Sequence, residues 1–245
     1  MAIPRFYCPP PLHASTRFEL PPAAAHHASR VLRLRVNDEV RIFDGVGNEL
    51  QGHIGEIQGK RVALENLQNC TVRSESSLQV VLAQALSSNE KMDWVIQKAT
   101  ELGVTEIQPI QTQRSMTKLT GERAEKRTQH WHGITIAACE QCGRNMLPEV
   151  HTPQEFGSWI TALGEVPGSK FILLPEAAAT LRDQSEPQGK TTLLIGPEGG
   201  FGIDEIQAAR QASFVAIRLG ARVLRTETAA VAGIAALETL WGDLG

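Results

Sequence analysis

The sequence has no apolar run close to the roughly 20 residues that a membrane-spanning helix needs. The first residues, Met1 to Phe6, lack the basic flank and the apolar stretch of a signal peptide. Cysteine is also scarce, with four in 245 residues, which is too few for a disulfide scaffold. These absences predict a cytoplasmic protein that has no membrane partner and keeps its cysteines as thiols.

An excess of charge of either sign is missing as well. The chain holds 24 Lys and Arg against 27 Asp and Glu, so its formal charge is 24 − 27 = −3. This balance argues against a generic protein that coats polyanions, and any contact with nucleic acid must come from local basic patches. With 42% hydrophobic and 21% charged residues, the composition is typical of a globular chain with a sizeable core.

The pattern of the chain changes near Gln68 to Ser77, where small and polar residues gather. We place a domain boundary there, which predicts domains 1–72 and 73–245. Before it, short segments rich in Val, Ile and Phe are separated by turn residues, which predicts a small antiparallel β-barrel. Pro22 followed by an Ala-rich stretch predicts one helix from Pro22 to Leu32.

After the boundary, apolar strands alternate with helical patterns. We expect strands at 78–86, 105–110, 171–174, 191–195 and 214–219, and helices at 88–102, 121–142, 204–212 and 226–241. Strands that are apolar on both faces and alternate with helices predict an α/β fold, with a parallel sheet covered by helices on both sides.

The strongest chemical signal is the segment from Leu193 to Glu205, in which a buried strand enters a turn with four glycines between Gly196 and Gly202. Glycines at the carboxyl end of a strand let the backbone approach a ligand closely, and ligands of open α/β sheets bind at that edge. Neither G-x-G-x-x-G nor a Gly-Lys-Ser/Thr element is present, which argues against a hydride-transfer enzyme and against a P-loop. A plain tight turn between strand and helix is the alternative.

A second loop repeats this arrangement from Leu219 to Ala229. Thr226 or Thr228 is placed to cap the last helix, and Arg225 is placed to project toward a bound ligand. Alternatively, Arg225 pairs with Glu227 or Glu238 on the surface.

Cys139 and Cys142 have the spacing of half a zinc site. Structural zinc needs four ligands, and the other cysteines, Cys8 and Cys70, are isolated in the sequence. We therefore predict no metal.

Basic residues gather at two places, either as solvated faces or as contacts for RNA phosphates. The first cluster is in the predicted barrel, a common RNA-binding module, and consists of Arg30, Arg33, Arg35 and Arg41 beside His26 and His27, with Arg5 and Arg17 as further candidates. The second consists of Arg114, Lys118, Arg123, Lys126 and Arg127.

Four motifs together carry a resemblance to a known family: Gly196-Pro197-Glu198-Gly199-Gly200-Phe201, Leu219-Gly220-x-Arg222-Val223-Leu224-Arg225-Thr226-Glu227-Thr228-Ala229, Glu140-Gln141-Cys142-Gly143-Arg144 and His27-x-x-Arg30-Val31-Leu32-Arg33. On these the chain resembles the 16S ribosomal RNA (uracil-N3) methyltransferases, also called ribosomal RNA small subunit methyltransferase E. The resemblance covers nearly the whole chain.

This resemblance implies a PUA-like barrel followed by a SPOUT domain whose parallel sheet carries a trefoil knot. It implies a homodimer that binds S-adenosylmethionine in the knot and methylates N3 of one uridine in the decoding region of 16S ribosomal RNA, as free RNA or in the small ribosomal subunit. The implied cofactor residues follow three strands: Leu174 and Glu176; Ile195, Gly196, Glu198, Gly199 and Gly200; Leu219, Gly220, Val223, Leu224 and Thr228.

For the chemistry we expect Arg144 and Arg225 to stabilise negative charge on the uracil ring, and Glu140 or Glu198 to receive the N3 proton or to order the loop. We expect Arg5, Arg30, Arg33, Arg35 and Arg114 to bind RNA. Two alternatives stay open: a SPOUT methyltransferase with another RNA target, and an RNA-binding assembly factor without catalysis.

Overall fold

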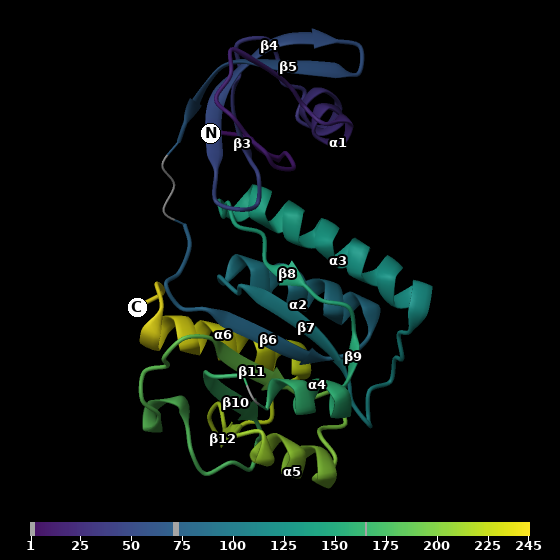
Figure 1. Cartoon of the computed structure of the whole chain (residues 1–245), viewed down its shortest axis with the longest axis vertical. Helices are drawn as coiled ribbons and strands as arrows, with labels where there is room; N and C mark the ends of the chain where they lie inside the picture. Colours follow the sequence, from purple (N-terminus) through teal and green to yellow (C-terminus); the bar gives the residue numbers. More distant parts are fainter. Residues whose placement is uncertain (1–2, 71–73, 165) are drawn as a thin grey trace. The chain divides into compact units, whose positions relative to one another are not determined.

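The computed structural model describes residues 3–70, 74–164 and 166–245. The chain forms two compact units, of which the first comprises Met1–Glu75 with Cys139–Leu147 and the second comprises Ser76–Ala138 with Pro148–Gly245 (Figure 1). The boundary predicted between residues 72 and 73 lies outside the described residues. The structure assigns Cys139–Leu147 to the N-terminal unit, a segment that the sequence prediction placed in the second domain.

The N-terminal unit is built on a five-stranded sheet. Its order is β1-β3-β4-β5-β2, formed by β1 (Arg5–Tyr7), β3 (Glu39–Phe43), β4 (Glu49–Gln58), β5 (Arg61–Asn69) and β2 (Arg17–Glu19). The prediction of antiparallel pairing holds for three pairs, whereas β1 pairs with β3 in parallel. Side chains such as Phe6, Ile42 and Ile54 are fully buried and form its core.

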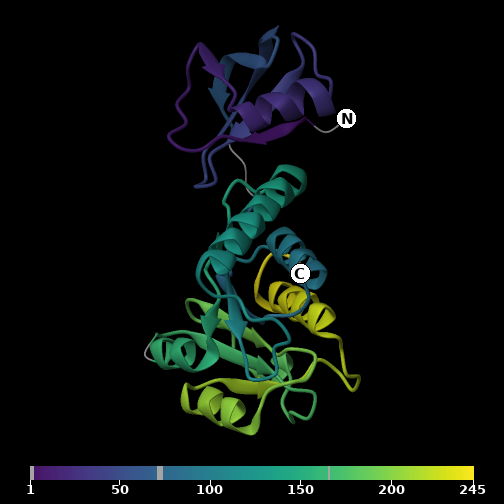
Figure 2. The ribbon, with the colours of Figure 1, turned by 90° about the vertical axis from the view of Figure 1, so that its right-hand side faces the viewer.

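One helical segment packs on this sheet, drawn in purple in Figure 2. The α-helix α1 (Pro22–His26) continues into a π-helical turn, η1 (His27–Val31), so the helix predicted from Pro22 to Leu32 is present but changes its hydrogen-bond pattern at His27. Arg33, with a φ of 54°, follows the segment and ends it. A π-helical turn is uncommon and often marks a functional site.

The C-terminal unit contains a wholly parallel sheet, which confirms the predicted α/β class. The strand order is β12-β10-β11-β6-β7-β8, with β9 also on β7. The strands are β6 (Val80–Ala85), β7 (Glu106–Gln111), β8 (Glu149–Val150), β9 (Gln154–Glu155), β10 (Ser169–Leu173), β11 (Thr191–Ile195) and β12 (Val215–Ile217).

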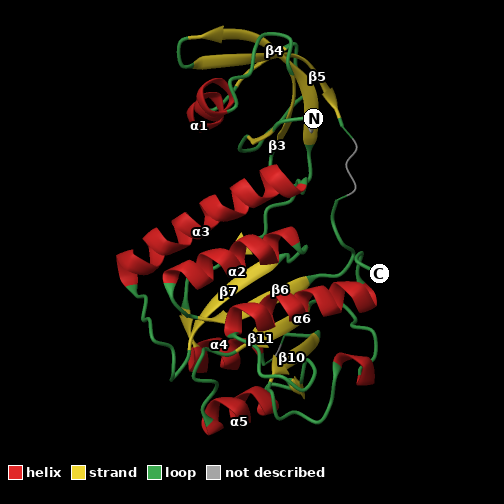
Figure 3. Cartoon of the chain, turned by 180° about the vertical axis from the view of Figure 1, so that it is seen from behind, coloured by secondary structure: helices red, strands yellow, loops and turns green. Residues whose placement is uncertain are grey.

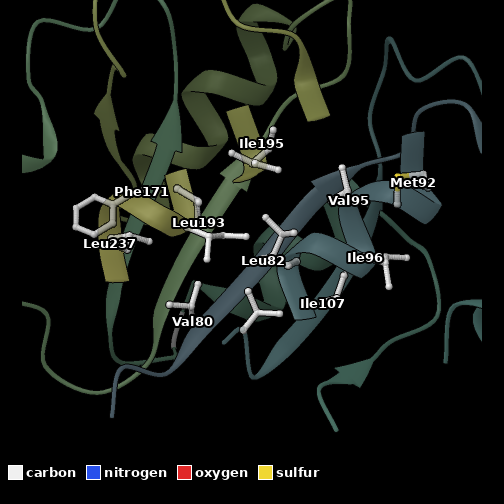
Figure 4. Close-up of a cluster of buried hydrophobic side chains, with 14 of the residues drawn as sticks. Val80, Leu82, Met92, Val95, Ile96, Ile107, Phe171, Leu193, Ile195 and Leu237 are labelled. Carbon is white, nitrogen blue, oxygen red and sulfur yellow. The ribbon is translucent and has the colours of Figure 1, made fainter. Parts of the chain in front are cut away.

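Helices cover both faces of this sheet, as the sequence predicts (Figure 3). On one face lie α2 (Asn89–Glu101), α3 (Gly121–Cys142) and α6 (Thr226–Trp241), with the short η2 (Leu181–Asp183), and on the other lie α4 (Phe156–Leu163) and α5 (Ile203–Gln211). Leu82, Leu193 and Ile96 belong to the apolar cluster of the first face (Figure 4). No helix in the described part of the chain is long and apolar enough to cross a membrane.

Candidate active site

A cavity of about 570 Å³ opens at the carboxyl ends of β10, β11 and β12. Its walls come from Leu173–Glu176, Ile195–Phe201, Ile217–Gly220 and Arg222–Thr226, with Arg114, Ile206 and Ala229 added from elsewhere in the C-terminal unit. The volume is that of a small-molecule site, and this edge of an open parallel sheet is where such ligands bind. The two glycine loops predicted from the sequence therefore do meet in one cleft.

The glycines of the first loop differ in the space that surrounds them. Gly200 has a φ of +68°, and a Cβ added there meets nothing within 4 Å. Gly196 is constrained in the opposite way, because a Cβ there would lie 2.9 Å from the buried ring of Phe201. Gly220, in the second loop, repeats the open arrangement with a φ of +73°. The main chain at Gly200 and Gly220 is therefore exposed to a ligand, although the Gly200 N–H already donates to Pro197 O at 2.9 Å.

Thr226 joins the two loops to the centre of the sheet. Its hydroxyl donates to the carbonyl oxygen of Gly196 at 2.6 Å and accepts a hydrogen bond from Gln84 Nε2 at 2.9 Å. Both side chains are buried. Of the two predicted capping residues, Thr226 is the first residue of α6 and Thr228 is exposed, and the N-cap position, Arg225, makes no side-chain capping bond.

Lys91 of α2, which sequence reasoning missed, contacts the first loop. Its Nζ lies 2.9 Å from Glu198 Oε1 and 3.5 Å from Glu227 Oε2. Hydrogen bonding to Glu198 raises the pKa of Lys91. Burial acts to raise the pKa of Glu198, but the hydrogen bond and the charge of Lys91 outweigh it and hold this pKa below its ordinary value. Glu198 is thus an ionised, ion-paired carboxylate, which suits ordering the loop better than accepting a proton.

The loop that follows β7 forms another wall. Arg114 Nη1 donates to the carbonyl oxygen of Gly199 at 2.8 Å. Glu205, in the first turn of α5, accepts from the backbone N–H of Gln113 and from that of Gly202, both at 2.8 Å. These bonds attach the Arg114 loop to the glycine loop, so Arg114 lies at the cavity.

The structure brings nearly all of the predicted cofactor residues together. Every one except Thr228 lines the cavity: Leu174, Glu176, Ile195, Gly196, Glu198, Gly199, Gly200, Leu219, Gly220, Val223 and Leu224. Arg225 also lines it and forms no ion pair among the described residues, so neither predicted surface partner engages it. That these residues bind a cofactor remains a prediction.

Arg144 and Glu140, the other catalytic candidates, belong to the N-terminal unit and not to the cavity lining. The Arg144 side chain is 4% exposed and donates from Nε and Nη2 to Glu75 Oε2 at 2.9 and 2.8 Å. Glu140 Oε1 accepts a hydrogen bond from the backbone N–H of Tyr7 at 3.0 Å. Both side chains hold their own unit together, and their catalytic roles stay predictions.

Of the residues predicted to bind RNA, Arg114 lines the cavity, and the other four divide into two groups. Arg5 uses four of its five N–H donors inside the N-terminal unit, on both carboxylate oxygens of the buried Glu49 and on the carbonyl oxygens of Cys139 and Arg144. It therefore has little left for a phosphate, and we now expect a structural role. The other group, Arg30, Arg33 and Arg35, is exposed, and within the described ranges none of the three forms an ion pair.

Metal ligands are not assembled in the described part of the chain, where no group of three or more His, Cys, Asp or Glu side chains could hold an ion. Cys139 and Cys142 are free thiols.

Comparisons with known proteins agree with this architecture. A family described as the RNA methyltransferase domain matches residues 74–238, and one described as the RNA methyltransferase PUA domain matches residues 20–65. A ribosomal RNA small subunit methyltransferase E of Buchnera aphidicola subsp. Schizaphis graminum is 36% identical, with 99% of this chain and 98% of the relative covered. The corresponding protein of Bacillus subtilis is 30% identical, with 92% and 93% covered.

Solved structures show the same similarity over the full chain. A ribosomal RNA small subunit methyltransferase E of Neisseria gonorrhoeae, bound to S-adenosyl methionine, superposes with a TM-score of 0.92 at 39% identity and covers 100% of both chains. A Legionella pneumophila protein in complex with the same cofactor has a TM-score of 0.93 at 36% identity, also with 100% of both chains covered.

The fold, the cavity at the strand ends and these matches define an RNA methyltransferase with an N-terminal PUA domain. More narrowly, the chain belongs to the ribosomal RNA small subunit methyltransferase E family.

Proposed function

We propose that this protein transfers a methyl group from S-adenosylmethionine to N3 of one uridine in the decoding region of 16S ribosomal RNA. The observation that carries the proposal is the cavity at the ends of β10, β11 and β12, whose walls are the motif loops 196–201 and 219–226. Relatives that share the whole fold bind S-adenosylmethionine.

The residues present fit this cofactor. Leu174, Ile195 and Leu219 offer apolar surface for an adenine ring, and the exposed main chain at Gly220, with the carbonyl of Gly200, offers hydrogen-bonding groups for the polar edges of that ring. When bound, S-adenosylmethionine supplies a methyl group on a sulfonium, which is electrophilic without any metal.

The chain has two tasks in such a reaction. It must hold the acceptor nitrogen in line with the donor, because orientation removes much of the barrier to a displacement. It must also stabilise the negative charge that reaches O2 and O4 of the uracil ring when the N3 proton leaves, and Arg225 at the cavity is our candidate for this role. We assign Glu198 to ordering the loop, because Lys91 neutralises it. A role for Glu140 as proton acceptor, and for Arg144 in charge stabilisation, rests on the motif alone.

The N-terminal unit is proposed to bind RNA through Arg30, Arg33 and Arg35. All three are exposed, and exposed Val31, Leu32 and Val36 lie between or beside them, which gives a surface of mixed cationic and apolar character. The homodimer, the trefoil knot and the cytoplasmic location implied by the resemblance stay predictions, as does the division into domains 1–72 and 73–245.

Methyl transfer in vitro tests the proposal. The purified chain is incubated with 16S ribosomal RNA, or with small ribosomal subunits, and S-adenosylmethionine carrying an isotopically labelled methyl group; the RNA is then digested and its nucleosides are analysed by mass spectrometry. We expect label in N3-methyluridine. Label in a ribose 2'-O-methyl nucleoside would point to another target, and calorimetry that found no cofactor binding to the free or RNA-bound chain would favour an assembly factor.

A further inference from the structure

Four arginines surround the cavity in addition to the residues that the proposed function uses to hold the cofactor. Arg114, Arg218, Arg222 and Arg225 all line it, and all four are solvent-exposed. Among the described residues none of them forms an ion pair with a carboxylate. Apart from a longer-range interaction of Arg218 with Asp183, whose pKa it helps to lower, their charge is therefore available to a ligand at the mouth of the cavity.

Two of these guanidinium groups are held in place by backbone carbonyls. Arg218 Nη1 donates to Ala177 O at 3.1 Å, and Arg114 Nη1 donates to Gly199 O at 2.8 Å. A guanidinium has five N–H donors, so each keeps most of its donors for another partner. Binding to a group that is already positioned costs less conformational entropy than binding to a mobile one.

The cavity lining carries more positive than negative side chains, and binding of the cofactor alone does not explain this excess. The lining contains four arginines against two glutamates, Glu176 and Glu198, and Lys91 already pairs with Glu198. S-adenosylmethionine itself carries a sulfonium, an ammonium and a single carboxylate, so a cationic rim repels it on balance. This rim also stands out from its surroundings, because residues 73–245 hold 16 Lys and Arg against 20 Asp and Glu, a net charge of 16 − 20 = −4.

We propose that Arg218 and Arg222, with Arg114 and Arg225 beside them, form a phosphate subsite at the mouth of the cavity that binds the RNA backbone next to the target nucleotide. Arginine suits this role because its planar donors match phosphate oxygens. Val223 lies between Arg222 and Arg225 in the sequence, is 80% exposed and offers apolar contact to a ribose or a base. The inference rests on the proposed function, since it assumes an RNA substrate at this cavity.

The test compares two double variants with the same change of charge. Arg218→Gln with Arg222→Gln removes two cations from the rim. Arg182→Gln with Arg210→Gln is the control, because both of these arginines are exposed in the C-terminal unit, form no ion pair within the described ranges and do not line the cavity. For each protein, calorimetry gives the dissociation constant for S-adenosylmethionine. A filter-binding titration with a 16S ribosomal RNA transcript at several salt concentrations gives the RNA affinity and its salt slope.

We expect the rim variant to bind RNA roughly tenfold more weakly than the control, with a salt slope less steep by roughly 0.7 for each lost contact to single-stranded RNA. Its affinity for S-adenosylmethionine should stay within about twofold of the unmodified chain. Weaker cofactor binding with unchanged RNA binding would overturn the inference and assign the rim to the cofactor carboxylate. If the rim variant and the control variant have the same RNA affinity and salt slope, the inference is overturned and the rim is a solvated face. A different result would contradict the proposed function itself: an unmodified chain that binds neither S-adenosylmethionine nor RNA. That result would also contradict the phosphate subsite.

Discussion

Lys91 Nζ lies 2.9 Å from Glu198 Oε1 and 3.5 Å from Glu227 Oε2, so one cation joins α2, the loop after β11 and the first turn of α6. Lys91 is the third residue of α2, where the positive end of the helix dipole disfavours a cation. The two carboxylates offset this cost and place the side chain against the cavity loop. We infer that Lys91 positions the loop for the cofactor.

Replacement of Lys91 by Met should weaken S-adenosylmethionine binding. The Glu198 carboxylate loses its partner, and the loop that carries it becomes less ordered, so we expect the dissociation constant to rise roughly threefold to tenfold. Calorimetric titration measures this. Lys91→Arg should restore most of the affinity. Lys98→Met, on the same helix, should leave it unchanged, because among the described residues Lys98 pairs with Glu101 alone. Equal affinities of the Lys91→Met and Lys98→Met proteins for S-adenosylmethionine would contradict a role of Lys91 in positioning the loop.

Thr226→Val should destabilise the chain by about 2 kcal/mol, because the Gly196 carbonyl loses its hydroxyl partner and the buried Gln84 Nε2 keeps Ala85 O but loses its second acceptor. Urea denaturation gives the free energy of unfolding. Thr239→Val, in the exposed last turn of the same helix, loses only a bond to Ala235 O and is the matched control. A difference of less than about 0.5 kcal/mol between the two variants would show that the hydroxyl is dispensable.

Arg5→Met should destabilise the chain by about 3 kcal/mol. The Glu49 side chain is fully buried, and after loss of its 2.8 Å partner the one cation left within ion-pair distance in the described part of the chain is Arg41, at 3.7 Å. The control is Arg61→Met, which breaks the exposed pair with Glu19 and should produce no resolvable change in the urea midpoint. If Arg5→Met unfolds at the control's midpoint and instead weakens RNA binding, Arg5 is an RNA contact after all.

Cys142 should react with iodoacetamide at neutral pH. The hydrogen bond with the thiol of Cys139 outweighs burial and, helped by the charge of Arg144, lowers the pKa of Cys142 to about 6. The thiolate is the reactive form, so the rate of alkylation should rise with pH and level off above a midpoint near pH 6. Mass spectrometry after timed alkylation measures this rate. The pKa of Cys139 is raised and its side chain is fully buried, so it should remain unmodified. A midpoint above pH 8 would contradict the prediction.

Local patterns predicted much of the fold. The helix from Gly121 to Cys142 and the strand from Thr191 to Ile195 have the predicted bounds, because length, periodicity and β-branched content are local properties. The helix α4 was missed because Phe156–Leu163 lies in a weakly patterned stretch and has no side-chain N-cap. The parallel pairing of β1 with β3 was missed because it joins strands distant in the sequence.

In the candidate site, too, local patterns predicted some features, and contacts between residues distant in the sequence were missed. Glycine loops at strand ends predicted the walls of the cavity, since the carboxyl ends of parallel strands share one edge. The contact of Lys91 with Glu198 joins residues 107 positions apart, and no local pattern reports it. Arg144 shows how a local motif can mislead. The motif predicted a catalytic role, whereas the structure buries the Arg144 guanidinium against Glu75, 69 positions away.

The most direct test of the central claim is mass mapping of 16S ribosomal RNA from cells that lack this gene and are complemented with the unmodified chain or with Gly196→Val. At Gly196, a side chain would displace the ring of Phe201 at the cavity wall. We expect one N3-methylated uridine in the decoding region with the unmodified chain, and none with the empty vector or with the folded variant. The same methylation pattern in all three strains, or a methyl group restored elsewhere in the RNA, would contradict this expectation.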